Sequence, residues 1–238
     1  MPRPSRQQGA HPPGALAGFT LIEMMIAMAV VGVILGISLS RLDRWSEDQR
    51  AKAAARSVAD LLQRARAGAI RTGSRHVVFF GNPGVADPSG NAVEKGGAWV
   101  PVLLIEDGPP ATANCAIDGG EILEAVEPVD DVTWGVSFAT ARVATDAGAA
   151  PFDPGGTWDG ATFNDQNNAK ISWMLFRPDG VPVPFVGAVG SCGAVGSTGR
   201  GGGAFYMTTG ERDFAVVLSR LGGVRLHVWD RSAGGWSS

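Results

Sequence analysis

The sequence has few of the residues that build catalytic and metal sites. It contains two cysteines and three histidines in 238 residues, and neither Cys115 nor Cys192 has a second cysteine or a histidine at ligand spacing. The Gly-rich run 190–203 has no Gly-Lys-Ser/Thr, which excludes a P-loop lysine. His76 and His227 fall in predicted strands, where we interpret them as ordinary strand residues. We therefore expect no enzyme activity, no cofactor and no metal.

Charge is also scarce. The formal net charge is −3, and the first eighteen residues carry Arg3 and Arg6 without an acid, so the remainder sums to −3 − 2 = −5. This mild acidity argues against a protein whose main role is to coat nucleic acid. The cysteines lie 77 positions apart; a disulfide is the leading interpretation for an extracytoplasmic domain, and two unpaired thiols are the alternative.

The N-terminus carries the strongest signal. Residues 1–18 are polar, and residues 19–39 form an apolar run with one charge. As a helix this run is about 31 Å long, close to the ~30 Å hydrocarbon core of a bilayer, which predicts a membrane-spanning helix rather than a buried core helix. A secretory signal peptide would be cleaved after the run, but small residues lie before it. The run should therefore remain in the mature protein, and only the leader should be lost.

Glu23 is the one charge within this run. A carboxylate near the centre of a spanning helix costs about 2.5–3.5 kcal/mol, and less near its end. Glu23 either reaches the headgroups or pairs with a cation. Cleavage after Gly18 would create such a cation, the free amine of Phe19, which could belong to a neighbouring subunit in a packed helical assembly.

The motif Gly18-Phe19-Thr20-Leu21-Ile22-Glu23, followed by the apolar run, resembles the processing site of type IV prepilins and type II secretion pseudopilins. The resemblance implies that a prepilin peptidase cleaves between Gly18 and Phe19 and N-methylates Phe19. It also implies that Glu23 acts in assembly with other pilins or pseudopilins. The count of positive charges does not favour a cytoplasmic leader; the resemblance places the leader inside and the C-terminal domain in the periplasm, with a single pass through the bacterial inner membrane.

Residues 40–73 predict an amphipathic continuation of the helix, because apolar residues recur at spacings of three and four and Gly73 is a plausible stop. Residues 74–238 then predict a β-rich domain. Expected strands are 76–80, 99–105, 121–127, 132–138, 171–177, 205–208, 214–220 and 224–229. A turn is expected at 177–180 and a two-residue Gly-Gly hairpin at Gly222-Gly223. Loops are expected at 81–98, 108–120, 139–170 and 187–203.

The segment 61–73 leading into 77–80, and the segments 176–180, 214–219 and 222–226, resemble the group of minor pseudopilin H (GspH) and FimT. The implied fold is α+β: a long N-terminal helix packed on a small antiparallel β-domain. The implied function is a structural minor pseudopilin of a type II secretion system, assembled into a periplasmic pseudopilus that pushes secreted proteins outward.

Two alternatives stay open. A FimT-like minor pilin would act in type IV pilus assembly or DNA uptake, with Arg220 and Arg225 among the arginines that could grip phosphates while Tyr206, Trp229 and Trp236 stack on bases. The DNA-binding relatives carry a Gly-Arg-x-Arg signature, of which this chain keeps one arginine, Arg225, and this weakens the case for DNA as a partner. A membrane-anchored enzyme is the other alternative, and no acid–base or metal cluster in the sequence supports it.

Overall fold

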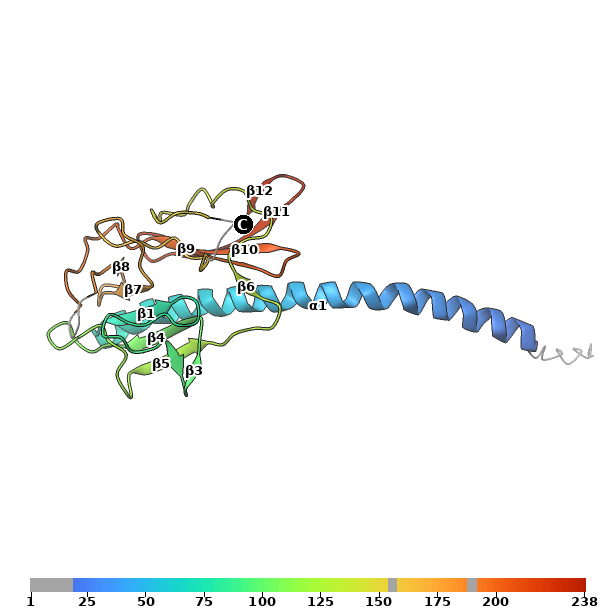
Figure 1. Cartoon of the computed structure of the whole chain (residues 1–238), viewed down its shortest axis with the longest axis horizontal. Helices are drawn as coiled ribbons and strands as arrows, with labels where there is room; N and C mark the ends of the chain where they lie inside the picture. The colour runs from blue at the N-terminus through green and yellow to red at the C-terminus, as the bar shows by residue number, and fades with distance from the viewer. Residues whose placement is uncertain (1–18, 154–157, 188–191) are drawn as a thin grey trace, which may run out of the picture. The chain divides into compact units, whose positions relative to one another are not determined.

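The structure is a computed structural model that describes residues 19–153, 158–187 and 192–238, with the backbone alone over 37–45. The chain divides between Asp43 and Arg44 into two compact units. The first contains the N-terminal part of a single long helix, and the second contains the rest of that helix and all described strands (Figure 1).

Helix α1 spans Leu21–Thr72. It begins after Thr20, whose hydroxyl and carbonyl oxygens both accept the Glu23 amide, at 3.3 and 3.1 Å. It ends at Gly73, which has φ +67° and donates its amide to the Ala69 carbonyl at 3.1 Å. The predicted stop is therefore confirmed, since a positive φ suits glycine at this position.

The apolar stripe of α1 packs into the domain. The fully or nearly buried members are Ala51, Ala54, Ala55, Val58, Leu61, Leu62, Ala65 and Ala69. Ile70, which the periodicity had placed on this stripe, is 54% exposed. It lies one residue past the buried Ala69, on the side of the helix that turns away from the core.

The first sheet has the order β5-β4-β1-β7-β8. Its strands are β5 Ile122–Val126, β4 Val102–Glu106, β1 His76–Phe80, β7 Trp173–Phe176 and β8 Pro182–Val183. All pairs are antiparallel, and β1 lies in the centre, with Val78 opposite both Leu104 and Met174. The turn after β7 forms as predicted: Gly180 has φ +75° and donates its amide to the Arg177 carbonyl.

The second sheet has the order β12-β11-β10-β9-β6 and is also antiparallel. Its strands are β12 Gly235–Ser237, β11 Val224–Asp230, β10 Asp213–Leu218, β9 Gly203–Thr208 and β6 Thr133–Trp134. A separate two-stranded ribbon joins β2 Glu94–Lys95 to β3 Ala98–Trp99. A helix followed by antiparallel sheets confirms the α+β class.

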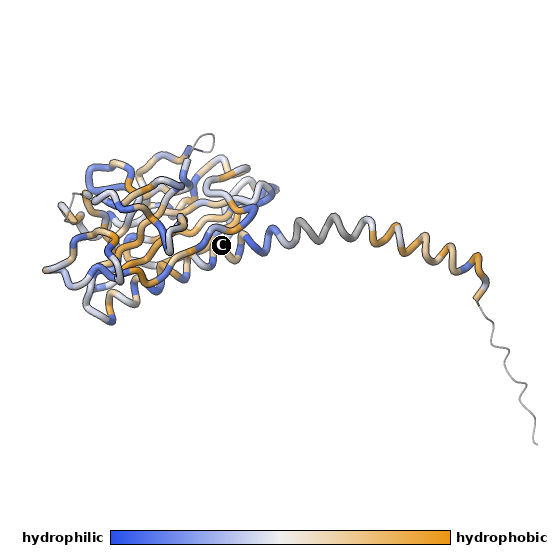
Figure 2. Tube along the Cα trace, turned by 60° about the horizontal axis from the view of Figure 1, so that its bottom comes forward, coloured by the Kyte–Doolittle hydropathy of each residue, from blue (hydrophilic) through white to orange (hydrophobic). Residues whose placement is uncertain are grey.

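One main core joins α1 to a face of each sheet. The helix contributes Val58 and Leu62, the first sheet Phe80 and Phe176, and the second sheet Phe214, among others. The opposite face of the first sheet has a second core around Phe79 and the two cysteines. In Figure 2 the hydrophobic colouring follows the inner strands and also the N-terminal part of α1.

Three details of the predicted strands are wrong. The strand expected over 99–105 breaks at Pro101, which has no amide to donate, and the chain changes partner from β2 to β1 there. The strand expected over 132–138 ends at Trp134. Short strands β2, β8 and β12 also form where loops or no strands were expected, since their two or three residues carry too weak a pattern to recognise.

The hairpin between β10 and β11 also differs from the expectation. Leu218 pairs with Val224, so the loop has five residues instead of two, and only Gly222 of the two glycines has a positive φ, +82°. Gly222 approaches the rest of the domain closely: its carbonyl accepts Arg66 Nη1 at 3.1 Å. A Cβ at this position would lie 2.9 Å from the Gly180 carbonyl oxygen. The contact with α1 shapes the loop more than local turn preference does.

Candidate assembly segment and candidate binding residues

The start of α1 is a capped helix terminus. Thr20 occupies the N-cap position and Glu23 the third helical position, the spacing of a capping box. A carboxylate in the first turn is favourable because the helix dipole places positive partial charge there. The sequence analysis assigned Glu23 a role in assembly but not this role in the first turn of the helix, although the sequence contains the Thr-x-x-Glu pattern of a capping box. Gly18 lies outside the described residues, while Phe19 is 78% exposed directly before the cap.

The apolar side chains of this segment are exposed on every side of the helix. Exposed fractions range from 52% at Val31 to 80% at Leu21. The other large members are Ile22, Met24, Met25, Ile26, Met28, Val30, Val33, Ile34 and Leu35. A contiguous apolar surface of this kind marks a site covered by a membrane or by another protein.

Within the described part of the chain, no helix has both the length and the apolar character needed to cross a membrane. The spanning role of residues 19–39 stays a prediction.

The two cysteines form a disulfide, Cys115–Cys192, with Cα atoms 4.8 Å apart. Asp107 stabilises this region, since its carboxylate accepts the amides of Cys115 (2.9 Å) and Asn114 (3.1 Å). Burial raises the pKa of Asp107, an effect that these two hydrogen bonds oppose. Asp107 and the two sulfurs lie within 4.8 Å of one another. The sulfurs are bonded to each other, however, and a metal would need them as thiolates.

The two histidines of the domain are buried in strands. His76, on β1, is 1% exposed and packs on Gly68 of α1. His227, on β11, is 7% exposed. Burial lowers the pKa of both, and Arg225 lowers that of His227 further. Each imidazole therefore lies in a packed environment that favours its neutral form, as expected for a strand residue.

Arg220 and Arg225 are both exposed. Arg225 lies on β11 opposite Val217, on the face turned away from the main core, while Arg220 lies in the loop after β10 with its Cγ near Gly202. Of the three rings expected to stack on bases, two are buried and the third, Trp236, is partly exposed. Tyr206 is fully buried and Trp229 is 8% exposed, because these rings pack around Trp236 with centroids 5.5 and 5.3 Å from it.

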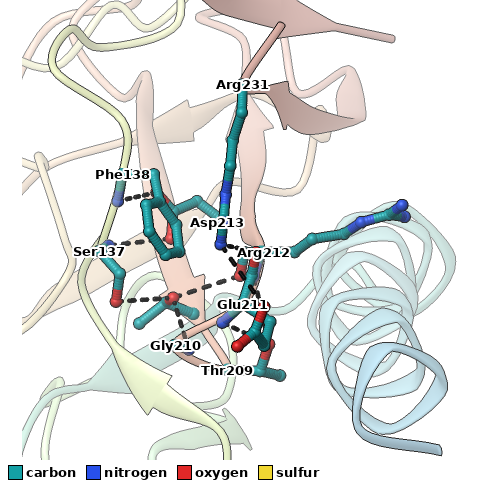
Figure 3. Close-up of polar contacts among 9 residues, drawn as sticks. Ser137, Phe138, Thr209, Gly210, Glu211, Arg212, Asp213 and Arg231 are labelled. Carbon is teal, nitrogen blue, oxygen red and sulfur yellow. Dashed lines mark hydrogen bonds and ion pairs between the residues drawn. The ribbon is translucent and has the colours of Figure 1, made fainter. Parts of the chain in front are cut away.

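Two further arginines make contacts with other residues of the same chain (Figure 3). Arg212 extends toward α1 in Figure 3. There it pairs with Asp48 of the helix at 3.2 Å. Arg231 lies over the Phe138 ring, 3.1 Å from its centroid, and donates to the Glu211 carbonyl. These contacts join the turn between β9 and β10 to the helix and to the segment after β6, so we assign them to structure rather than to nucleic-acid binding.

Asp213 has a structural role that the sequence pattern did not indicate. Its carboxylate is fully buried and accepts three consecutive amides, from Ser137, Phe138 and Ala139, at 2.6–2.9 Å. Figure 3 shows the first two of these bonds. Three such bonds satisfy a buried charge that would otherwise be costly. They also explain why the predicted strand 132–138 does not continue to its expected end. The Gly135 amide still bonds to the Tyr206 carbonyl of β9, but the amides of residues 137–139 bond to Asp213 instead of to a strand.

One known family motif matches the chain, and the match lies at its N-terminus. Residues 17–39 match the prokaryotic N-terminal methylation motif. No curated protein and no solved structure shows significant similarity to the chain. The matched region contains the capped helix start and most of the exposed apolar surface. It supports a type IV pilin-like protein that is processed by a prepilin peptidase and assembles with other pilins.

Proposed function

We propose that the chain is a structural subunit of a pilin-like filament, made as a precursor and anchored by residues 19–39 in the bacterial inner membrane. A prepilin peptidase removes residues 1–18 between Gly18 and Phe19 and methylates the new N-terminus, and the domain of residues 74–238 faces the periplasm. The methylation motif over residues 17–39 is the observation that carries this proposal.

The energetics of the segment favour assembly. Burying one large aliphatic or aromatic side chain stabilises by about 1.5–3 kcal/mol, and eleven large apolar side chains from Leu21 to Leu35 are more than half exposed. Lipid or the helices of neighbouring subunits would cover them. Glu23 would then leave water as well, and the amine of a neighbour's Phe19 would offset that cost.

Within this class we propose a minor pseudopilin of a type II secretion system, similar to GspH, which helps to export secreted proteins. The resemblance of the α1–β1 junction and of the closing strands supports it. The packing of α1 against antiparallel sheets agrees with the fold that this resemblance implies. The role would be structural rather than catalytic.

The specific alternative is a FimT-like minor pilin that binds DNA during uptake. The exposure of Arg220 and Arg225 favours it, whereas burial removes Tyr206 and Trp229, two of the three proposed stacking partners. Salt-dependent DNA binding by the wild type that falls on changing Arg225 to Ala, and not on changing Arg212 to Ala, would favour this alternative. Lost secretion with normal DNA uptake in a deletion strain would favour the secretion role.

Processing is tested with Gly18→Ala, which should leave a precursor that migrates more slowly on a gel. A normal mature band would contradict the assigned cleavage site.

Assembly is tested with Glu23→Ala, which should leave the protein in the membrane fraction but reduce its amount in sheared filaments. Glu47→Ala, an acid further along the same helix, is the matched control and should assemble normally. Equal incorporation of both variants would refute the assembly role of Glu23.

A further inference from the structure

Three exposed apolar side chains gather around the last turns of α1. Beyond the N-terminal segment, the large hydrophobic side chains exposed in the described residues are Ile70 (54%), Leu123 (51%) and Leu221 (72%). They come from the helix, from the edge strand β5 and from the loop between β10 and β11. Convergence of three elements makes this a surface rather than a set of isolated residues.

Contacts with the exposed face of α1 place these side chains on its two flanks. A Cβ on Gly180 would lie 2.6 Å from Ile70 Cδ1, and a Cβ on Gly222, next to Leu221, would lie 3.1 Å from Arg66 Nε. On the other side of the helix, Leu123 lines a groove with Ala67, Gly68 and Arg71. We call the surface formed by Ile70, Leu123, Leu221, Arg66 and Arg71 the basic end surface.

Its charge indicates the kind of partner that it fits. Arg66 and the exposed Arg71 lie among the apolar side chains. Arg64 also borders the groove and is paired with Glu124 at 2.8 Å. Arginine beside apolar side chains is typical of protein interfaces. A symmetric contact would place arginine against arginine, so the partner should present an apolar centre flanked by acids.

The chain itself carries a segment of this description. The loop 127–131 reads Glu127-Pro128-Val129-Asp130-Asp131, and all of it except Val129 is exposed. One of its three acids, Asp131, pairs with Arg50 at 3.2 Å. The loop therefore offers the exposed Pro128 flanked by two further carboxylates, while Val129 packs against the main core. This arrangement complements the basic end surface.

The acidic loop 127–131 and the basic end surface lie beside different parts of α1. Val129 of the acidic loop lines a groove with Ala53 and Ala54, whereas the basic end surface is centred on Ala67 to Ile70. At 1.5 Å per residue, the separation along α1 is roughly 20–25 Å. A second copy displaced along the helix by this distance would bring its acidic loop onto the basic end surface. A contact between two different surfaces need not close into a symmetric pair, so it is compatible with two neighbouring copies that are staggered along a filament.

We propose that the basic end surface binds the loop 127–131 of a second copy of this chain in a head-to-tail contact. The proposal rests on the pilin-like assembly proposed above and specifies one contact between its globular domains.

Disulfide trapping in the full-length chain tests the contact in membranes. Ile70→Cys and Asp130→Cys, carried on two differently tagged copies, should form a mixed dimer under mild oxidation, because Cys115 and Cys192 are already paired. Thr145→Cys, another exposed position, replaces Asp130→Cys in the control pair and should give background yield. Adding Arg71→Glu should lower the specific yield about fivefold, and Arg71→Lys should preserve it.

A second pair separates this contact from assembly itself. Val30→Cys, in the N-terminal segment, should form dimers with itself if the helices pack together. If Val30→Cys dimers form while the Ile70–Asp130 pair gives only background, the head-to-tail contact is wrong and assembly stands. If neither pair forms, both proposals fail. Dimers of Ile70→Cys with itself would indicate a symmetric contact and overturn the proposal.

Discussion

Removing the disulfide should destabilise the domain strongly. Cys115 and Cys192 are separated by 77 residues, and the chain-entropy relation gives about 4.5 kcal/mol for a loop of that length. Asp107 still holds the Cys115 amide when the sulfurs are gone, so part of the native loop geometry survives. We expect the double variant Cys115→Ser/Cys192→Ser to lose about 3–4.5 kcal/mol of unfolding free energy.

Urea unfolding followed by tryptophan fluorescence measures this loss. With an m-value of about 2 kcal/mol per molar, the midpoint should fall by roughly 1.5–2 M relative to the wild type. Ser197→Ala, a change at an exposed residue of the loop that carries Cys192, is a control that should leave the midpoint unchanged. A loss below about 1 kcal/mol would refute the reasoning. Maleimide labelling of two thiols in the unfolded, unreduced wild type would refute it independently.

Three further predictions concern local structure. Gly160→Ala should lower the unfolding free energy by about 3 kcal/mol or more, because φ is +70° and a Cβ would lie 2.7 Å from the Gly135 amide nitrogen. Gly210→Ala, with φ +80° and open space around it, should lower it by about 1 kcal/mol. Equal losses for the two variants in denaturant unfolding would contradict this. Burial holds the pKa of His76 below 6.5, so the unfolded chain takes up the proton first as the pH falls. The unfolding free energy should therefore decrease below about pH 6.5, and it should decrease less steeply in His76→Gln. An unchanged slope in the variant would count against a buried neutral imidazole. Thr20→Ala should weaken the first turn of α1 by about 1 kcal/mol, seen as faster amide exchange at Glu23, while Thr20→Ser should behave like the wild type.

The N-terminal segment and the helix could be predicted from the sequence because their signals are local. An apolar run with one acid is continuous in sequence, and the period of α1 can be counted without knowledge of the rest of the fold. The centre of each sheet was also predictable, since β1 has four consecutive apolar residues after His76 and β10 has five after Asp213, all of them buried.

The remaining features depend on contacts between distant residues. The strand break at Pro101 marks a change of partner from β2 to β1, and a single sequence does not name strand partners. Burial of Tyr206 depends on Asp146, which accepts its hydroxyl at 2.9 Å from 60 positions away. The contact between Arg66 and Gly222 in the β10–β11 hairpin joins residues 156 positions apart and could not be predicted for the same reason. The candidate DNA site also differs from the prediction: its arginines are exposed, but Tyr206 and Trp229 are buried and only Trp236 is partly exposed.

Asp213 has a consequence for the solubility of the domain. β6 is an edge strand of its sheet and is only two residues long. Free amides in the chain that follows it could pair with an extended segment of another molecule. Asp213 occupies three of those amides, which leaves fewer groups free for unwanted strand pairing beside β6. Under the proposed function, such protection would help a subunit to remain monomeric in the membrane until its helix is taken into a filament.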